Sequence, residues 1–175
     1  MESAGGGWTV IQHRNRDNPR VNFNTTWDEY KRGFGDVNGN YWIGNDAIRK
    51  LTTAYENSLY IRMESTKKKS YEVQYTLFSI SNETDGYRLS LGQKSGNIAD
   101  KFRSWHEVVN HPFSTFDHAR NRCAAQCGSG WWYKNCALVN LNAPFAGGPR
   151  DPVWEGIISS GSDLFLSEMM IKRKH

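Results

Sequence analysis

Apolar side chains alternate with polar ones in three successive segments, which is the two-residue period of a strand with one buried face. The alternating apolar positions are Leu59, Ile61 and Met63, then Val73, Tyr75 and Leu77, then Tyr87, Leu89 and Leu91. The connection at residues 81–86 ends in Asp-Gly, which favours a tight turn. The pattern therefore predicts an antiparallel meander with one buried face.

Shorter elements are predicted on both sides of the meander. Residues 8–12 indicate a strand. A helix is expected over residues 27–32, because Thr26 can cap it and two acidic residues occupy its first turn. A second helix, capped at residue 45 or 46, should run to about residue 51, and residues 165–172 indicate a final strand.

Regular periodicity fades between residue 93 and about residue 161, where Gly, Asn, Pro and Trp are frequent. A loop region of that length is uncommon in a compact domain unless it is functional or cross-linked. The expected architecture is α+β: an antiparallel sheet with short helices that carries a large, irregular C-terminal lobe. The chain has 175 residues, and we expect one domain over 5–173 with flexible termini at 1–4 and 174–175.

Composition narrows the classes of function. Hydrophobic residues make 38% of the chain and charged residues 23%, which argues against intrinsic disorder. Apolar runs are shorter than the roughly 18 residues of a membrane span, and the first seven residues have no signal-peptide pattern. The net charge of +4 is too small to indicate nucleic acid, and the basic triplet at 67–69 fits a solvated hairpin loop. We expect neither a nucleic-acid partner nor membrane insertion.

Three cysteines, Cys123, Cys127 and Cys136, lie within fourteen residues. Two N-glycosylation sequons begin at Asn24 and Asn82. Together they favour a secreted chain with one disulfide and one spare thiol. A Cys123–Cys136 bridge would close a short loop and contribute about 3 kcal/mol to stability.

Six short motifs follow one another along the chain. They are GGGWTVIQ at 5–12, WDEYKRGFG at 27–35, YWIGN at 41–45, FST at 113–115, GWWYKNC at 130–136 and NLN at 140–142. This ordered set resembles the fibrinogen C-terminal domain, a family that includes ficolins, tachylectins, angiopoietins and tenascins. The resemblance runs from residue 5 to about residue 173, and the family's N-terminal subdomain has no counterpart before it.

The resemblance implies that the domain binds a ligand or partner and has no enzymatic activity. Family members bind acetylated sugars, peptide termini or receptors through a pocket beside the disulfide of the C-terminal lobe. Transferred to this chain, the disulfide is Cys123–Cys136, and Cys127 is unpaired. The pocket residues would be Arg122, Cys123, Ala124, Gln126, Trp132, Tyr133 and Asn135. Trp131 is expected in the core, Trp132 either in the core or under a sugar ring, and Tyr133 in the pocket lining.

The family usually has an acidic calcium loop after its FST motif. Here Asp117 is followed by Ala119, Arg120 and Arg122, so the stretch offers one carboxylate. Calcium takes about 6–8 oxygen ligands. We therefore expect Asp117 to belong to a degraded calcium site with weak or absent binding, and no other cofactor.

Three functions compete at this point. The first is a secreted lectin for acetylated or acidic glycans on a pathogen or cell surface, acting in innate immunity. The alternative is a protein–protein interaction module that binds a receptor or peptide through the same lobe, with or without homo-oligomers. The third is a zinc or thiol site built from the cysteines with His111 or His118, but the cysteines lack the paired CxxC spacing that is typical of zinc ligands.

Overall fold

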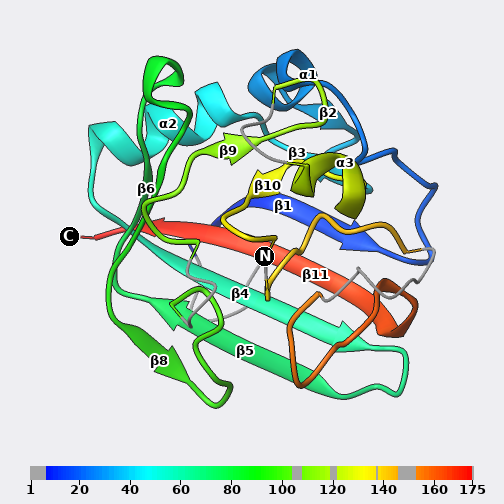
Figure 1. Ribbon diagram of the computed structural model, residues 1–175. Helices are drawn as coiled ribbons and strands as arrows, with labels where there is room; N and C mark the ends of the chain where they lie inside the picture. The colour runs from blue at the N-terminus through cyan, green and yellow to red at the C-terminus, as the bar shows by residue number, and fades with distance from the viewer. Residues whose placement is uncertain (1–6, 104–107, 119–121, 137, 146–152, 175) are drawn as a thin grey trace.

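The computed structural model describes residues 7–103, 108–118, 122–136, 138–145 and 153–174. Its largest element is a seven-stranded antiparallel sheet with the strand order β2-β3-β1-β11-β4-β5-β8 (Figure 1). The strands are β1 (Thr9–Asn15), β2 (Phe34–Gly35), β3 (Tyr41–Trp42), β4 (Asn57–Ser65), β5 (Ser70–Tyr75), β8 (Lys94–Gly96) and β11 (Leu164–Arg173). The terminal strand β11 lies between β1 and β4, so both ends of the chain meet in the middle of the sheet.

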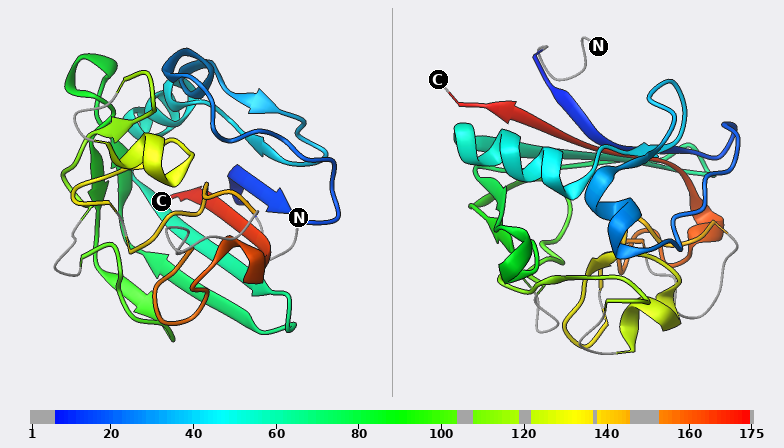
Figure 2. Two further views of the ribbon diagram at one scale, coloured as in Figure 1. Left: turned by 45° about the vertical axis from the view of Figure 1, so that its right-hand side comes forward. Right: turned by 90° about the horizontal axis from the view of Figure 1, so that it is seen from above.

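The helices and the irregular segments cover one face of this sheet. The right-hand panel of Figure 2 shows α1 (Trp27–Arg32), α2 (Asn45–Ala54) and the irregular C-terminal region on the same side. Between the layers lies a continuous hydrophobic core with a high share of aromatic side chains. The α+β class, with an antiparallel sheet and an irregular lobe, is therefore confirmed. Among the described residues, the helices are too short and too polar to cross a bilayer.

The first helix follows directly from local sequence. Thr26 accepts a hydrogen bond from the Glu29 N–H, and the Glu29 side chain reaches back to the Thr26 backbone, which forms a capping box. The second helix differs from its prediction, since its N-cap is Gly44, which makes no side-chain cap bond. Asn45 is buried instead and accepts a hydrogen bond of 3.0 Å from the Trp42 indole.

The predicted meander is correct for two of its three segments. Strands β4 and β5 pair antiparallel, with Leu59 opposite Tyr75. The third segment forms a strand, as predicted, but its place in the meander is wrong: β7 (Leu89–Leu91) pairs antiparallel with β6 (Phe78–Ile80) in a separate two-stranded sheet. The reason is that the chain leaves the main sheet after β5, and β6 packs against α2.

Candidate functional site: a disulfide-bridged lobe and an arginine-lined cavity

A single disulfide organises the irregular region. Cys123 and Cys136 are bonded with their Cα atoms 5.0 Å apart, and the Cys136 N–H donates to the Cys123 Sγ at 2.7 Å. Cys123 begins the short helix α3 (Cys123–Cys127), and Gly128 ends this helix in the left-handed conformation with φ 64°. We call the described residues of 113–145 the disulfide lobe. The lobe contains the disulfide that the resemblance implies, and Cys127 is buried and lies outside this disulfide.

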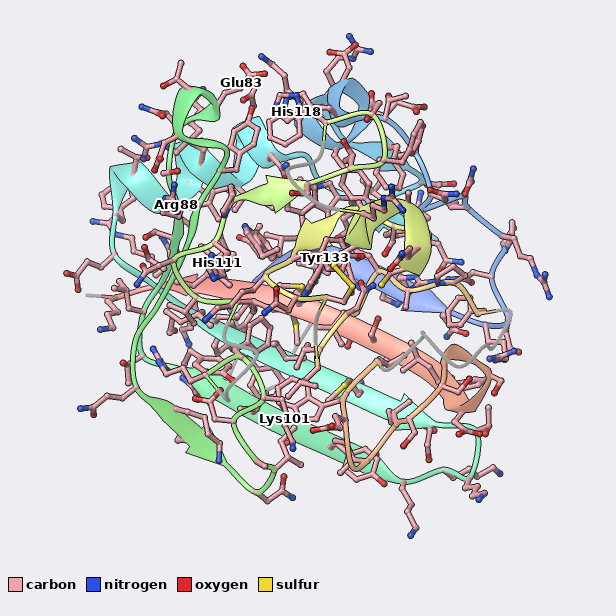
Figure 3. All side chains as sticks on the ribbon, in the orientation of Figure 1. Glu83, Arg88, Lys101, His111, His118 and Tyr133 are labelled. Carbon is pink, nitrogen blue, oxygen red and sulfur yellow. A yellow bond between two sulfur atoms is a disulfide. The ribbon has the colours of Figure 1, made fainter. Side chains whose placement is uncertain are left out.

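The aromatic residues of the lobe form its interior. Trp131 and Trp132 are 0% exposed and Tyr133 is 3% exposed. The Trp132 indole donates to the Tyr87 carbonyl at 2.8 Å. The Tyr133 hydroxyl donates to the Ser129 carbonyl at 3.0 Å (Figure 3). Since this hydroxyl finds its partner inside the lobe, the structure places Tyr133 in the core and not in a pocket lining, and burial raises its pKa.

The remaining predicted contact residues divide by exposure. Cys123 and Ala124 are buried, whereas Arg122, Gln126 and Asn135 are exposed. Arg122 and Asn135 each precede a bridged cysteine, so the disulfide holds them on one edge of the lobe. We call Arg122, Gln126, Lys134 and Asn135 the lobe rim; all four are exposed.

Sequence reasoning missed an exposed aromatic residue in the same lobe. Phe116 is 46% exposed in the turn that follows β9 (Phe113–Ser114). The backbones of Thr115 and His118 pair on either side of this turn. A phenylalanine beside a polar turn residue was the available signal, because exposed aromatic side chains often anchor protein interfaces.

Asp117, the predicted metal ligand, takes part in local structure. Its Oδ1 accepts hydrogen bonds from the Trp27 N–H at 3.0 Å and from the Thr115 hydroxyl at 2.7 Å. His118 stacks on the Trp27 indole, with centroids 4.0 Å apart (Figure 3). Residues 119–121 of the expected calcium loop lie outside the described residues. Within the described part, no three His, Cys, Asp or Glu side chains come together as a metal site.

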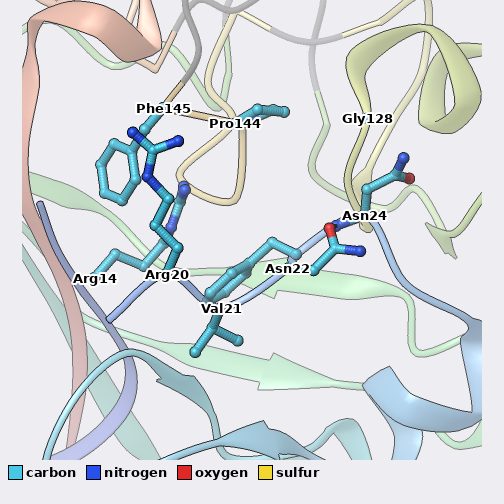
Figure 4. A pocket seen from close by; sticks show the side chains of 9 residues that line it. Arg14, Arg20, Val21, Asn22, Asn24, Gly128, Pro144 and Phe145 are labelled. Carbon is cyan, nitrogen blue, oxygen red and sulfur yellow. The ribbon is translucent and has the colours of Figure 1, made fainter. Parts of the chain in front are cut away.

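A cavity of about 320 Å³ lies beside the lobe, and the sequence alone did not predict it (Figure 4). It is lined by Arg14, Arg20, Val21, Asn22, Phe23, Asn24, Gly128, Pro144 and Phe145. These residues come from β1, from the connection to α1, from the end of α3 and from the end of the lobe. The predicted aromatic pocket residues Trp132 and Tyr133 do not line it.

Arg14 is the buried cation of this cavity and is 2% exposed. Its Nη1 donates to the Leu141 carbonyl at 2.7 Å and to the Ala143 carbonyl at 2.6 Å. Its guanidinium carbon lies 4.5 Å from the Phe23 ring centroid and 4.2 Å from that of Phe145, as in cation–π contacts. Burial lowers the pKa of Arg14 to about 10, and its buried Nε has no hydrogen-bond partner among the described residues.

This combination of a twisted antiparallel sheet, short helices and a disulfide-bridged lobe is shared with known proteins. The C-terminal globular domain of fibrinogen beta and gamma chains matches residues 1–172. Human angiopoietin-related protein 6 is 41% identical over 146 residues, which are 81% of this chain and 30% of that protein. Fibrinogen-like protein A of Apostichopus parvimensis is 32% identical over 99% of this chain and 63% of its own length. The chain thus spans less than half of that angiopoietin-related relative.

Solved structures agree with these sequence matches. The fibrinogen-like globe domain of human ANGPTL6 superimposes with a TM-score of 0.87 at 36% identity, covering 99% of this chain and 81% of that one. Lamprey fibrin D-dimer, complexed with the peptide Gly-His-Arg-Pro-amide, gives a TM-score of 0.77 at 26% identity over 97% of this chain and 62% of that one. The chain belongs to the fibrinogen C-terminal domain family.

Proposed function

We propose that this protein is an extracellular, non-catalytic recognition domain that binds a protein partner through the rim of its disulfide lobe. The observation that carries the proposal is the division of the lobe into a closed aromatic interior and a polar rim. Arg122, Gln126, Lys134 and Asn135 are exposed on elements that one disulfide joins. Because the disulfide already orders this edge, little conformational entropy is lost when a partner binds, as is typical of a preformed contact surface.

The family relatives support a protein partner. The lamprey fibrin relative was solved with a peptide ligand. The angiopoietin-related relatives share the fold and up to 41% of aligned residues with this chain. Extracellular residence is supported by the disulfide, which persists in oxidising compartments, and by the exposed sequon residues Asn24 and Asn82.

A lectin function has weaker support from the same residues. Sugar rings bind readily on exposed aromatic faces, yet Trp131, Trp132 and Tyr133 are closed off from solvent. Phe116 is the large aromatic side chain that the described part of the lobe exposes. A protein surface can use one such aromatic anchor with a polar surround. We therefore favour the protein partner over acetylated or acidic glycans.

The test separates the two partners on one surface. The domain is biotinylated, assembled on labelled streptavidin and bound to cells of the source organism. One cell sample is pretreated with trypsin, and another with mild periodate, which cleaves glycan diols and spares polypeptide. The proposal predicts that trypsin removes binding while periodate and excess N-acetylglucosamine leave it. Binding that survives trypsin but disappears with periodate or the free sugar would establish the lectin function instead.

A further inference from the structure

Three arginines gather at the cavity beside the disulfide lobe. Arg14 and Arg20 line it, and the Arg16 guanidinium carbon lies 5.0 Å from the centroid of the Phe145 ring that forms one wall. Arg16 donates to three carbonyls: Nε to Leu164 at 2.9 Å, and Nη2 to Gly161 at 2.7 Å and to Ser162 at 2.9 Å.

None of these three cations has an acidic partner among the described residues. The ion pairs there join other groups, such as Lys101 with Glu155 and Arg103 with Asp100. Arg14 and Arg16 bond to carbonyl oxygens, which orient a guanidinium but do not neutralise its charge. Buried cations in proteins are normally paired with an anion. Counting the described residues, the cavity therefore has a local excess of positive charge.

The other walls define what kind of anion fits. Val21, Phe23, Pro144 and Phe145 provide apolar surface, and the Asn22 side chain supplies an amide for hydrogen bonding. The volume of about 320 Å³ is at the lower end for ligand pockets, which range from about 300 to 1,000 Å³. An acidic group attached to a compact apolar side chain matches this mixture better than a hydroxyl-rich sugar does.

We propose that this cavity binds a carboxylate of an acidic peptide segment in the protein partner, with a neighbouring apolar side chain seated against Val21 and Phe145. This inference rests on the proposed function, because it takes the partner to be a protein. Arg20 is exposed and can close on the carboxylate as a planar fork, since guanidinium and carboxylate match in bidentate geometry. Arg14, held by its carbonyls between two rings, supplies a fixed positive charge behind it.

The probe is a pair of small molecules that differ only in charge. N-Acetyl-phenylalanine carries a carboxylate beside an aromatic side chain, and N-acetyl-phenylalanine amide is its neutral counterpart. Each is titrated into ¹⁵N-labelled protein and followed by backbone amide chemical shifts. The expected result is saturable shifts at residues 21–24, Gly128 and Phe145, with at least tenfold weaker binding of the amide. Equal binding of both probes, or shifts confined to other parts of the protein, would overturn the proposal.

Two variants separate the site from general charge attraction. Arg20→Gln should weaken binding of the carboxylate probe at least fivefold. Arg173→Gln removes the same charge from an exposed residue at the C-terminal end of β11, and it should leave binding unchanged. Arg173 pairs there with Asn57, whereas Arg14 pairs with Ser167 nearer the other end of the strand. Equal loss in both variants would overturn the assignment.

N-Acetylneuraminic acid forms the third arm of the titration. Binding of this sugar acid at the cavity without binding of N-acetyl-phenylalanine would overturn the peptide assignment in favour of an acidic glycan. The two proposals also fail separately. Trypsin-sensitive cell binding combined with no carboxylate binding overturns this inference alone, whereas trypsin-resistant cell binding overturns the proposed function.

Discussion

Removing the Cys123–Cys136 disulfide should lower the stability of the whole domain by a measurable amount. The bridged residues are 13 positions apart. In the chain-entropy model a loop of that length contributes about 3 kcal/mol. For a domain of this size, each 1 kcal/mol shifts the thermal midpoint by about 2–4 °C. Reduction should therefore lower Tm by about 6–12 °C.

The assay is calorimetry or circular dichroism with and without a phosphine reductant. Three proteins are compared: the wild type, Cys127→Ala, and the double variant Cys123→Ala/Cys136→Ala. Cys127 is the matched control, because it lies in the same helix, is 6% exposed like Cys123, and is not bridged. Reductant should lower Tm of the wild type and of Cys127→Ala, and leave the double variant unchanged. A wild-type Tm that does not respond to complete reduction, verified by thiol counting, would show that the disulfide does not stabilise the domain.

Three further predictions follow from local geometry. Gly130→Ala places a Cβ 2.5 Å from the buried Tyr30 ring and should cost about 1–3 kcal/mol in urea unfolding. Gly39→Ala meets its nearest atom, the Asp36 carbonyl oxygen, at an ordinary contact distance of 3.8 Å and should be near neutral; equal costs would contradict the packing. Burial raises the pKa of Tyr60 from 10 to about 12, so the protonated phenol stabilises the folded state below pH 10, and this contribution is lost as pH rises toward 12. The free energy of unfolding, measured by urea melts, should therefore fall less steeply between pH 10 and pH 12 in Tyr60→Phe than in the wild type, and equal slopes would disprove this. Thr26→Asp keeps a side chain that can cap the first helix but removes the sequon at Asn24. It should eliminate the same glycan mass as Asn24→Gln and leave Tm unchanged, and a lower Tm would show that the cap is lost.

Elements fixed by local contacts could be predicted from the sequence. The capping box at Thr26 and Glu29 involves residues three positions apart, and the alternation of β4 and β5 reports directly on one buried face. The central position of β11 could not be predicted, because its pairing with β1 joins residues at opposite ends of the chain. Alternation likewise could not show whether the segment at residues 87–91 joins the main sheet.

The site was predictable only in part for the same reason. The motifs led to the disulfide and to the rim residues Arg122 and Asn135. They could not show that Tyr133 turns inward, since that depends on hydroxyl, amide and carbonyl partners inside the folded lobe. The cavity at Arg14 depends on a hydrogen bond to Leu141, 127 positions away, and no local pattern encodes it.

The most direct test of the central claim is a comparison of two charge-reversal variants in the cell-binding assay. Arg122→Glu alters the lobe rim, and Lys50→Glu alters an exposed residue of α2 outside it. Both are checked for an unchanged Tm, and the half-saturating concentration of the streptavidin-assembled domain is measured for each. We expect at least tenfold weaker binding for Arg122→Glu and wild-type binding for Lys50→Glu. Wild-type binding by Arg122→Glu would contradict the assignment of the rim as the recognition surface.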